Sequence, residues 1–362
     1  MVDWLVVCAV SGLGPARVQQ LLTQMDVEEI RQRLEFEPQA LPLPASLLAK
    51  CHIDFNKVEQ ALTWLDSQPN HYIVTLSDPL YPPLLAQISD PPQVLFVKGS
   101  IESLVLPSVA IVGSRNASRG GLDMAADLAR HLASQGFAIT SGMATGIDGA
   151  AHKATLAVNG TTMAVLGCGV ECIYPKRHLN LYQDIINTGC VISEYWPDIG
   201  PFAGNFPRRN RIVSGLSLGT VVVEASRKSG SLISARLAME QNREVFAVPG
   251  SVLGGYSQGC HDLIKNGAKL VESAADIIEE LSCLSDYHLE QLHLRYHIQD
   301  NAICDLPFHP LLASVGYETT AVDAVVEDSG KPIDLVLIQM LELELQGWVA
   351  AVPGGYVRLK RS

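Results

Sequence analysis

The middle of the chain alternates between short apolar runs and segments with helical periodicity. The seven apolar runs between residues 109 and 281 are 109–112, 137–140, 162–166, 190–193, 220–223, 245–248 and 268–271. Continuous apolar runs of this length are typical of strands buried on both faces of a parallel sheet. The helical segments between them end next to glycines, at Gly136, Gly160 and Gly189, as helices commonly do. Right-handed crossovers between such strands predict an α/β fold with a doubly wound parallel sheet.

The first 108 residues predict a helical domain followed by an extended connector. Apolar residues recur at helical spacing over residues 1–66, for example at Val18 and Leu21. Residues 67–108 form a lead-in that contains seven prolines and two β-like runs, Tyr72–Thr75 and Val94–Val97. Because proline removes a backbone donor, we expect these runs to be edge strands of the sheet.

A tight turn joins the first two predicted helices. The segment Ser11–Arg17 contains Gly12, Gly14 and Pro15, with a basic residue in the first turn of the next helix. One interpretation is a compact interhelical turn with proline at the first helical position. The other is the hairpin of a helix-hairpin-helix module, in which backbone amides hold a DNA phosphate. The compact turn is favoured, because one hairpin is a weak signal.

The C-terminal part predicts a linker and a small separate domain. Residues 282–308 lose periodicity. Residues 309–362 contain three helical segments, Leu311–Val315, Ala321–Val326 and Ile333–Leu345, and then two β-like runs around Pro353-Gly354-Gly355. Three helices followed by a hairpin are typical of a winged helix. The predicted domains are therefore 1–66, 67–281 and 309–362, with 282–308 as the linker.

Charge is distributed unevenly along the chain. The net charge of −12 argues against a nucleic-acid partner when it is taken alone. Residues 110–236, however, hold 12 Lys and Arg against 8 Asp and Glu, whereas the remainder holds 14 against 30. The predicted sheet is therefore basic and its flanks are acidic.

Cysteine usage and hydropathy favour a cytoplasmic protein without metal or membrane. The eight cysteines lie mostly in apolar runs, and the Cys168–Cys172 pair lacks a second pair of ligands, so we expect reduced thiols. The histidines and cysteines of residues 282–308 do not make a complete ligand set, which favours a polar linker over a metal cluster. No apolar run reaches the ~18–20 residues that span a bilayer. Residues 1–10 lack a basic start and are expected to be a buried helix rather than a signal peptide.

Small residues, hydroxyls and cations follow the predicted strands. In an open parallel sheet, ligands bind beyond the carboxyl ends of the strands, where small residues and helix N-termini accommodate anions. The residues at these positions are Gly113, Ser114, Arg115, Ser141, Gly142, Phe206, Arg208, Arg209, Asn210, Arg211, Arg227, Lys228, Ser229 and Gly230. We expect them to converge on one rim that binds phosphate groups.

Common nucleotide and catalytic motifs are missing from this rim. Arg115 stands where a dinucleotide-binding loop needs its second glycine, and no Walker loop occurs. We expect His152 to pack behind the Ser141-Gly142 loop and Asp148 to cap a helix. The other acids, Glu194 and Glu224, are scattered rather than clustered as a metal-dependent nuclease requires. These observations predict no catalytic residue, no cofactor and no metal.

Repeated phosphates in a row explain the rim better than a single nucleotide does. The segment Phe206–Arg211 combines three arginines with an aromatic ring, which suits backbone neutralisation and base stacking on single-stranded nucleic acid. Taken alone, this segment is better explained as a solvated helix start with Phe206 in the core, since arginine at a helix N-terminus is unfavourable. Together with Arg115, Arg227 and Lys228, it favours single-stranded nucleic acid.

Five motifs in order resemble the DNA-processing protein DprA (Smf) family. They are Gly113-Ser114-Arg115, Ser141-Gly142 through Gly146-Ile147-Asp148, Phe206-Pro207-Arg208-Arg209-Asn210-Arg211-Ile212, Ser229-Gly230-Ser231-Leu232 and Pro249-Gly250-Ser251. The resemblance implies an extended Rossmann-like domain and a non-enzymatic role. It implies binding and protection of incoming single-stranded DNA in natural transformation, loading of the RecA recombinase, and a homodimer formed through the Rossmann-like domain. It also implies DNA contacts by Arg115 and the Phe206–Arg211 segment.

Three further hypotheses follow from the residues. The segment 309–362 holds four basic and seven acidic residues, and its predicted recognition helix has no cation, so we expect it to dock protein rather than read duplex DNA. An alternative to DNA binding is a Rossmann-like enzyme acting on a small nucleotide phosphate, with Glu194 or Glu224 as its acid. A scaffold with a vestigial rim is the third.

Overall fold

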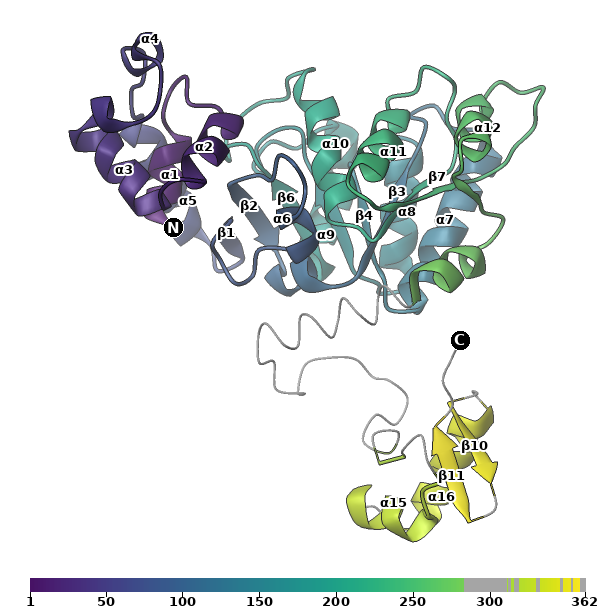
Figure 1. Ribbon diagram of the computed structural model, residues 1–362. Coiled ribbons are helices and arrows are strands. Elements are labelled where there is room, and N and C mark those ends of the chain that lie inside the picture. Colours follow the sequence, from purple (N-terminus) through teal and green to yellow (C-terminus); the bar gives the residue numbers. More distant parts are fainter. Residues whose placement is uncertain are drawn as a thin grey trace. The chain divides into compact units, whose positions relative to one another are not determined.

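The structure is a computed structural model with two compact units, Met1–His297 and Ile298–Ser362 (Figure 1). It describes residues 1–282, 311, 314–315, 319–329, 333–345, 348–352 and 354–358. The predicted linker, with Cys283, Cys304 and its three histidines, therefore lies almost wholly outside the described residues. Each unit is described by itself below.

The first unit is built on a nine-stranded sheet, which confirms the predicted α/β fold. The strand order is β1-β2-β6-β5-β4-β3-β7-β8-β9, and the seven strands from β6 to β9 in this order run parallel. The strands are β1 (His71–Thr75), β2 (Val94–Gly99), β3 (Ser108–Val112), β4 (Ala138–Ser141), β5 (Thr162–Val165), β6 (Cys190–Ser193), β7 (Gly219–Val222), β8 (Glu244–Ala247) and β9 (Lys269–Leu270).

The prediction of two edge strands in the lead-in is right for β1 and wrong for β2. Strand β2 pairs with β1 on one side and with β6 on the other, antiparallel in both cases. Pro91 and Pro92 precede β2 and Pro107 follows it, so β2 itself contains no proline and keeps its backbone donors. The lead-in therefore extends the parallel sheet by an antiparallel hairpin.

Helices cover both faces of the sheet. One face carries α6 (Pro83–Ala86), α10 (Asn205–Gly215), α11 (Ser231–Glu240) and α12 (Gln258–Lys265), packed on a core that includes Ile212 and Ala235. The other face carries α7 (Arg119–Ser134), α8 (Ile147–Ala157), α9 (Leu179–Thr188) and a helix over 274–282. Short 3-10 turns lie at η2 (Ile101–Val105) and η3 (Lys176–His178).

The order of the strands reverses once, and this reversal positions the site. The chain runs from β3 through β4 and β5 to β6 by way of α7, α8 and α9. Helix α10 then returns it to β7, which lies on the opposite side of β3. The crevice beyond the carboxyl ends of β3, β4 and β7 is thus the topological switch point, where open α/β sheets bind ligands.

The N-terminal helices have a small core of their own and also pack on the sheet. They are α1 (Val2–Cys8), α2 (Pro15–Leu22), α3 (Val27–Phe36), η1 (Pro38–Ala40), α4 (Ala45–Leu48) and α5 (Phe55–Ser67). Val18 and Ile30 belong to the separate core, whereas Trp4 and Trp64 share a cluster with β2 and α9. The turn before α2 is closed by Arg17, whose Nη1 donates to the carbonyl of Gly12 at 2.9 Å.

The described part of the second unit contains two helices and a hairpin. They are α15 (Val322–Ser329), α16 (Ile333–Leu345), β10 (Val349–Val352) and β11 (Gly355–Arg358), the two strands being antiparallel. The predicted winged helix is confirmed, although its first helix lies largely outside the described residues. In the described part of the chain, no helix is long and apolar enough to cross a membrane.

Candidate functional site

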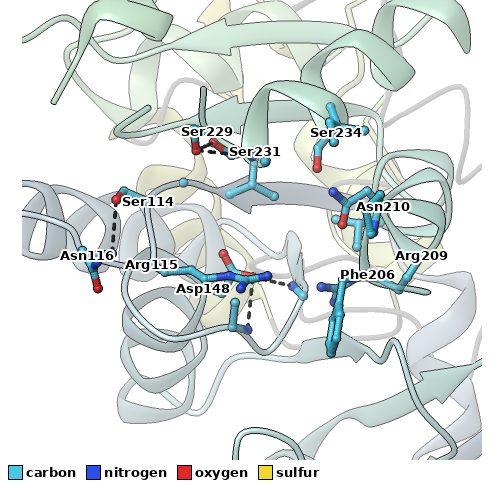
Figure 2. Close-up of a pocket in the computed structure, with 18 of the residues that line it drawn as sticks. Ser114, Arg115, Asn116, Asp148, Phe206, Arg209, Asn210, Ser229, Ser231 and Ser234 are labelled. Atoms are coloured by element: carbon cyan, nitrogen blue, oxygen red, sulfur yellow. Dashed lines mark hydrogen bonds between the residues drawn. The ribbon is translucent and has the colours of Figure 1, made fainter. Parts of the chain in front are cut away.

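A cavity of about 600 Å³ lies at the switch point (Figure 2). Five segments build it: the loop after β3, the loop between β4 and α8, the segment before η3, the first turns of α10, and the loop between β7 and α11. The predicted site residues that line it are Gly113, Ser114, Arg115, Gly142, Phe206, Arg209, Asn210, Ser229 and Gly230. The sequence-predicted convergence of these strand ends is therefore present in the fold.

The mouth of this cavity carries a cation above an aromatic pair. The guanidinium of Arg115 lies 5.9 Å from the centre of the Phe206 ring, within cation–π range. Tyr174 is the second ring of this pair, with its ring centre 5.3 Å from that of Phe206. The two rings together are called the aromatic platform below. Arg115 is exposed, and within the described residues it has no acidic partner. A charged group and two rings are thus presented together to solvent.

The floor of the cavity holds a second cation, Arg209, whose side chain is buried. Its Nη1 donates to the carbonyl of Val165, and it is 4% exposed. Burial lowers the pKa of Arg209, and the nearby carboxylate of Asp148 opposes this effect. Gly142 is required here, because a Cβ at this position would overlap the guanidinium.

Asp148 does not cap its own helix, contrary to the prediction. Its Oδ2 accepts from the backbone amides of Gly142 at 3.1 Å and Ala144 at 3.3 Å, and α8 has no side-chain cap. Gly142 was expected on a rim that binds phosphate, but the carboxylate of Asp148 already accepts from its amide. Burial raises the pKa of Asp148, while Arg209 and the two amides act in the opposite direction.

The carboxylate of Glu224, which follows β7, lies at the N-terminus of α7, the helix that follows β3. It accepts from the amide of Ser118 at 2.9 Å and from the Ser118 hydroxyl, at the N-terminus of α7. In dinucleotide-binding folds the corresponding helix N-terminus holds the pyrophosphate. An internal carboxylate in this place agrees with the missing glycine motif. Glu224 does not line the switch-point cavity.

His152 lies behind the Ser141-Gly142 loop, as predicted. Its side chain is fully buried, and its Nδ1 lies 2.6 Å from the hydroxyl of Thr162. That hydroxyl donates to the carbonyl of Ile139, so the imidazole Nδ1 is the donor. Burial lowers the pKa of His152 to about 3, which keeps the ring neutral at physiological pH.

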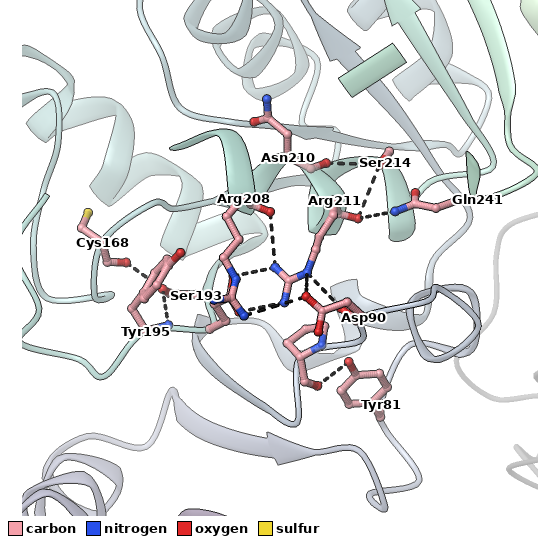
Figure 3. Close-up of polar contacts among 12 residues, drawn as sticks. Tyr81, Asp90, Cys168, Ser193, Tyr195, Arg208, Asn210, Arg211, Ser214 and Gln241 are labelled. Atoms are coloured by element: carbon pink, nitrogen blue, oxygen red, sulfur yellow. Dashed lines mark hydrogen bonds and ion pairs between the residues drawn. The ribbon is translucent and has the colours of Figure 1, made fainter. Parts of the chain in front are cut away.

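The three arginines of α10 do not share one face. Phe206, Arg209 and Asn210 point to the switch-point cavity, whereas Arg208 and Arg211 turn toward Asp90 and Glu194 (Figure 3). Helical spacing explains the division, since residues three and four apart share a face. The sequence prediction treated these arginines as one dense patch, which is wrong in this respect.

Arg211 is held in a buried ion pair. Its two terminal nitrogens contact both oxygens of Glu194, at 2.5 and 2.8 Å, and the residue is 6% exposed. Burial lowers the pKa of Arg211, but the hydrogen bonds to Glu194 outweigh it and the pKa is raised. The structure therefore does not bring Arg211 to the cavity, and it removes Glu194 from the candidate acids there.

Three other predicted residues also lie away from the cavity wall. Ser141 is buried, and its hydroxyl donates to the carbonyl of Ile111 at 2.6 Å, so it supports the loop from behind. Arg227 is exposed and pairs with Asp262 at 2.9 Å. Lys228 is exposed beside it. Neither cation lines the cavity.

Tyr174 of the aromatic platform and three exposed cations near it in the fold were not predicted from the sequence. Tyr174 lines the cavity, and η3 begins two residues later with Lys176 and Arg177, both exposed. Lys153 of α8 is also exposed, and with Arg177 it acts electrostatically on His178. Among the described residues these three cations have no acidic partner. The signal was present in the Tyr174–Arg177 sequence, but this segment does not directly follow a strand.

The cysteines of the described chain are free thiols. They are Cys8, Cys51, Cys168, Cys172, Cys190 and Cys260. The Sγ of Cys168 donates to the carbonyl of Cys172 at 3.0 Å. Burial raises the pKa of Cys168 to about 12, so this thiol is not poised to react.

Comparison with known families decides the relationship of the chain. The family model described as DNA recombination-mediator protein A matches residues 72–282, and the DprA winged helix domain matches residues 305–355. The chain belongs to the DprA family. Protein Smf of Escherichia coli is 47% identical over 306 residues, which cover 84% of this chain and 82% of that protein. DNA processing protein DprA of Streptococcus pneumoniae is 46% identical over 206 residues, covering 57% and 73% respectively.

Solved DprA structures share the fold. The X-ray structure of DNA processing protein A from Streptococcus pneumoniae has a TM-score of 0.61 and 36% identity, covering 74% of this chain and 98% of that one. DNA processing protein A from Helicobacter pylori, described for its single-stranded DNA binding mode, has a TM-score of 0.53 and 33% identity. It covers 59% of this chain and 96% of that one.

Proposed function

We propose that this chain binds single-stranded DNA at the switch-point cavity. The observation that carries the proposal is Arg115, exposed, free of acidic partners among the described residues, and placed over the Phe206 ring. A cation for the phosphate and an aromatic platform for the base are the two elements of sequence-independent single-strand binding. The Helicobacter pylori relative, described as binding single-stranded DNA, supports it.

The strand runs from the cavity over the aromatic platform to the cations of η3 and α8. Arg209 and the hydroxyls of Ser229 and Ser231 lie on the inner side of this path. Lys176, Arg177 and Lys153 lie on the outer side as exposed cations. Five of the cations in residues 110–236 therefore lie along this track, where they can neutralise successive phosphates.

In the cell, the chain serves natural transformation. By its family, it protects incoming single-stranded DNA in the cytoplasm, acts as a homodimer through the Rossmann-like domain, and loads RecA for recombination. No catalytic step is proposed. The alternative, an enzyme on a small nucleotide phosphate, lacks its two candidate acids at the cavity: Arg211 holds Glu194, and Ser118 holds Glu224.

Changing Arg115 to Ala tests the proposal. Arg115→Ala should weaken oligothymidylate binding about tenfold or more, because a hydrogen bond to a charged group contributes about 1.5–3 kcal/mol. It should also reduce the slope of log K against log salt by about 0.7. Fluorescence titration across a salt series measures both quantities.

Arg236→Ala is the matched control for this experiment. Arg236 is an exposed arginine of α11 whose one ion-pair partner among the described residues is Glu240, and it lies outside the cavity. Its replacement should leave affinity and slope unchanged. Equal effects of the two substitutions, or no effect of Arg115→Ala, would contradict the proposal.

A further inference from the structure

A second cavity, of about 190 Å³, opens at the same edge of the sheet. It lies beyond the carboxyl end of β6, where the segment Glu194–Trp196 meets the start of β2 and the helices α1 and α2. The first turns of α10 separate it from the switch-point cavity. Phe206 lines the first cavity and Arg208 lines the second, so a strand that crosses this turn reaches both.

The walls of the second cavity are aromatic and apolar. The rings of Trp196 and Phe96 lie 5.6 Å apart between their centres, and Pro92 and Val94 complete this side. Flat apolar walls of this kind suit the faces of a planar ring. Arg208 lines the same cavity with a side chain that is 41% exposed.

The negative charge of Glu194 in this wall is already compensated. Arg211 holds both carboxylate oxygens of Glu194, at 2.5 and 2.8 Å. Arg208 contacts Glu194 and Asp90 only at 3.6 and 3.8 Å. Arg208 is thus the loosely held member of this group, and it can turn to a phosphate without leaving Glu194 unpaired.

Tyr195 supplies a polar group without a partner. Its hydroxyl oxygen is buried and makes no hydrogen bond among the described residues, and Tyr195 is one of the residues that line the cavity. Burial raises the pKa of Tyr195 to about 12, so the hydroxyl stays protonated and available as a donor. A buried donor without an acceptor costs free energy, which a ligand that brings an acceptor recovers.

We infer that this second cavity takes one unpaired nucleobase of the bound strand, with a base carbonyl accepting from Tyr195 and the neighbouring phosphate contacting Arg208. The inference rests on the proposed function. It goes beyond it by naming a second subsite and by giving Arg208 a role different from that of Arg209.

Coupling between Tyr195 and one base tests the inference. Oligothymidylates with a single abasic position, moved along the strand, are titrated against the full chain and against Tyr195→Phe. Tyr195→Phe should weaken binding of the intact oligomer about threefold to tenfold, the usual effect of losing a neutral hydrogen bond. At one abasic position this loss should disappear, because the base that accepts the hydrogen bond is gone.

Controls separate this subsite from a general effect on the fold. Tyr195→Phe removes a hydroxyl without a described partner, so thermal unfolding should not occur at a lower temperature. Tyr256→Phe, which removes an exposed hydroxyl at a third cavity, should leave affinity unchanged. If the cavity instead holds an apolar side chain of a partner protein, Tyr195→Phe should leave the affinity for every oligomer unchanged. That result would overturn the inference.

The possible results distinguish this inference from the proposed function. If affinity depends on Arg115 while Tyr195→Phe has no effect, or has the same effect at every abasic position, the second subsite is overturned and the proposed function is left standing. Failure of the native chain to bind oligothymidylate overturns the subsite and the proposed function together. Loss of the Tyr195 effect at one abasic position supports both.

Discussion

Two internal carboxylates take the positions that a small phosphate ligand would need. Asp148 binds the amides of Gly142 and Ala144, and Glu224 binds Ser118 at the start of α7. Backbone amides and a helix N-terminus are what such folds offer to a nucleotide phosphate. With these donors already used, the switch point offers side chains instead, chiefly Arg115 and Arg209. This arrangement favours a polymer that brings one phosphate after another.

The buried imidazole of His152 predicts how stability depends on pH. Its pKa is about 3 in the folded chain and 6.5 when it is free, so between these values the unfolded chain binds more protons. Stability is therefore lost as the pH falls through 6.5 toward 3. His152→Asn lacks this titration and should lose less stability over the same range. Urea unfolding at several pH values between about 7 and 4 measures the difference.

The prediction concerns how the stability difference between the native chain and His152→Asn changes with pH. The size of that difference at neutral pH does not test it. The smaller asparagine leaves a cavity, which should destabilise the variant by about 1–3 kcal/mol at every pH. Other titrating groups act in both proteins and cancel. A stability difference that stays constant from neutral to acid pH would show that the imidazole is not held neutral by burial.

Helix α10 shows which part of the site the sequence could predict. The strand ends, the small residues and the dense arginines are visible in the sequence, and the parallel sheet brings Gly113, Gly142 and Phe206 together as expected. The partners of the arginines are not visible there. Asp90 lies in the lead-in and Glu194 after β6, far from Arg211 in sequence. Only the fold places the three residues in one cluster.

Helix α16 predicts the behaviour of the winged helix. Ile333, Leu337 and Leu341 are exposed at a spacing of four residues, and the helix sequence contains no Lys or Arg. A helix that reads a DNA major groove needs cations and polar side chains there. A chain ending at His297, the boundary of the first unit, should therefore bind duplex DNA as tightly as the full chain. Competition between duplex and oligothymidylate measures this.

The truncated chain also carries its own control. Its affinity for oligothymidylate should equal that of the full chain, which shows that the first unit is intact. A selective loss of duplex binding, with oligothymidylate binding preserved, would mean that the winged helix contacts DNA. The hypothesis that this unit docks protein rather than DNA would then be wrong.

At the scale of the whole molecule, both cavities lie along the carboxyl edge of one sheet. The seven parallel strands were predictable from continuous apolar runs, because strands buried on both faces leave a simple pattern. The antiparallel pairing of β2 with β6 was not, since pairing between distant segments leaves no local signal. The second cavity depends on this pairing, and the sequence therefore gave no indication of it.

The most direct test of DNA binding at the switch point is the dependence of affinity on oligomer length. Oligothymidylates of increasing length, titrated against the native chain at several salt concentrations, should bind more tightly until both cavities are filled and then level off. Affinity should fall steeply with salt, and a nucleoside monophosphate should compete poorly. No binding at low salt, or a monophosphate that saturates the site and displaces the oligomer, would contradict the claim that the switch point binds a DNA strand.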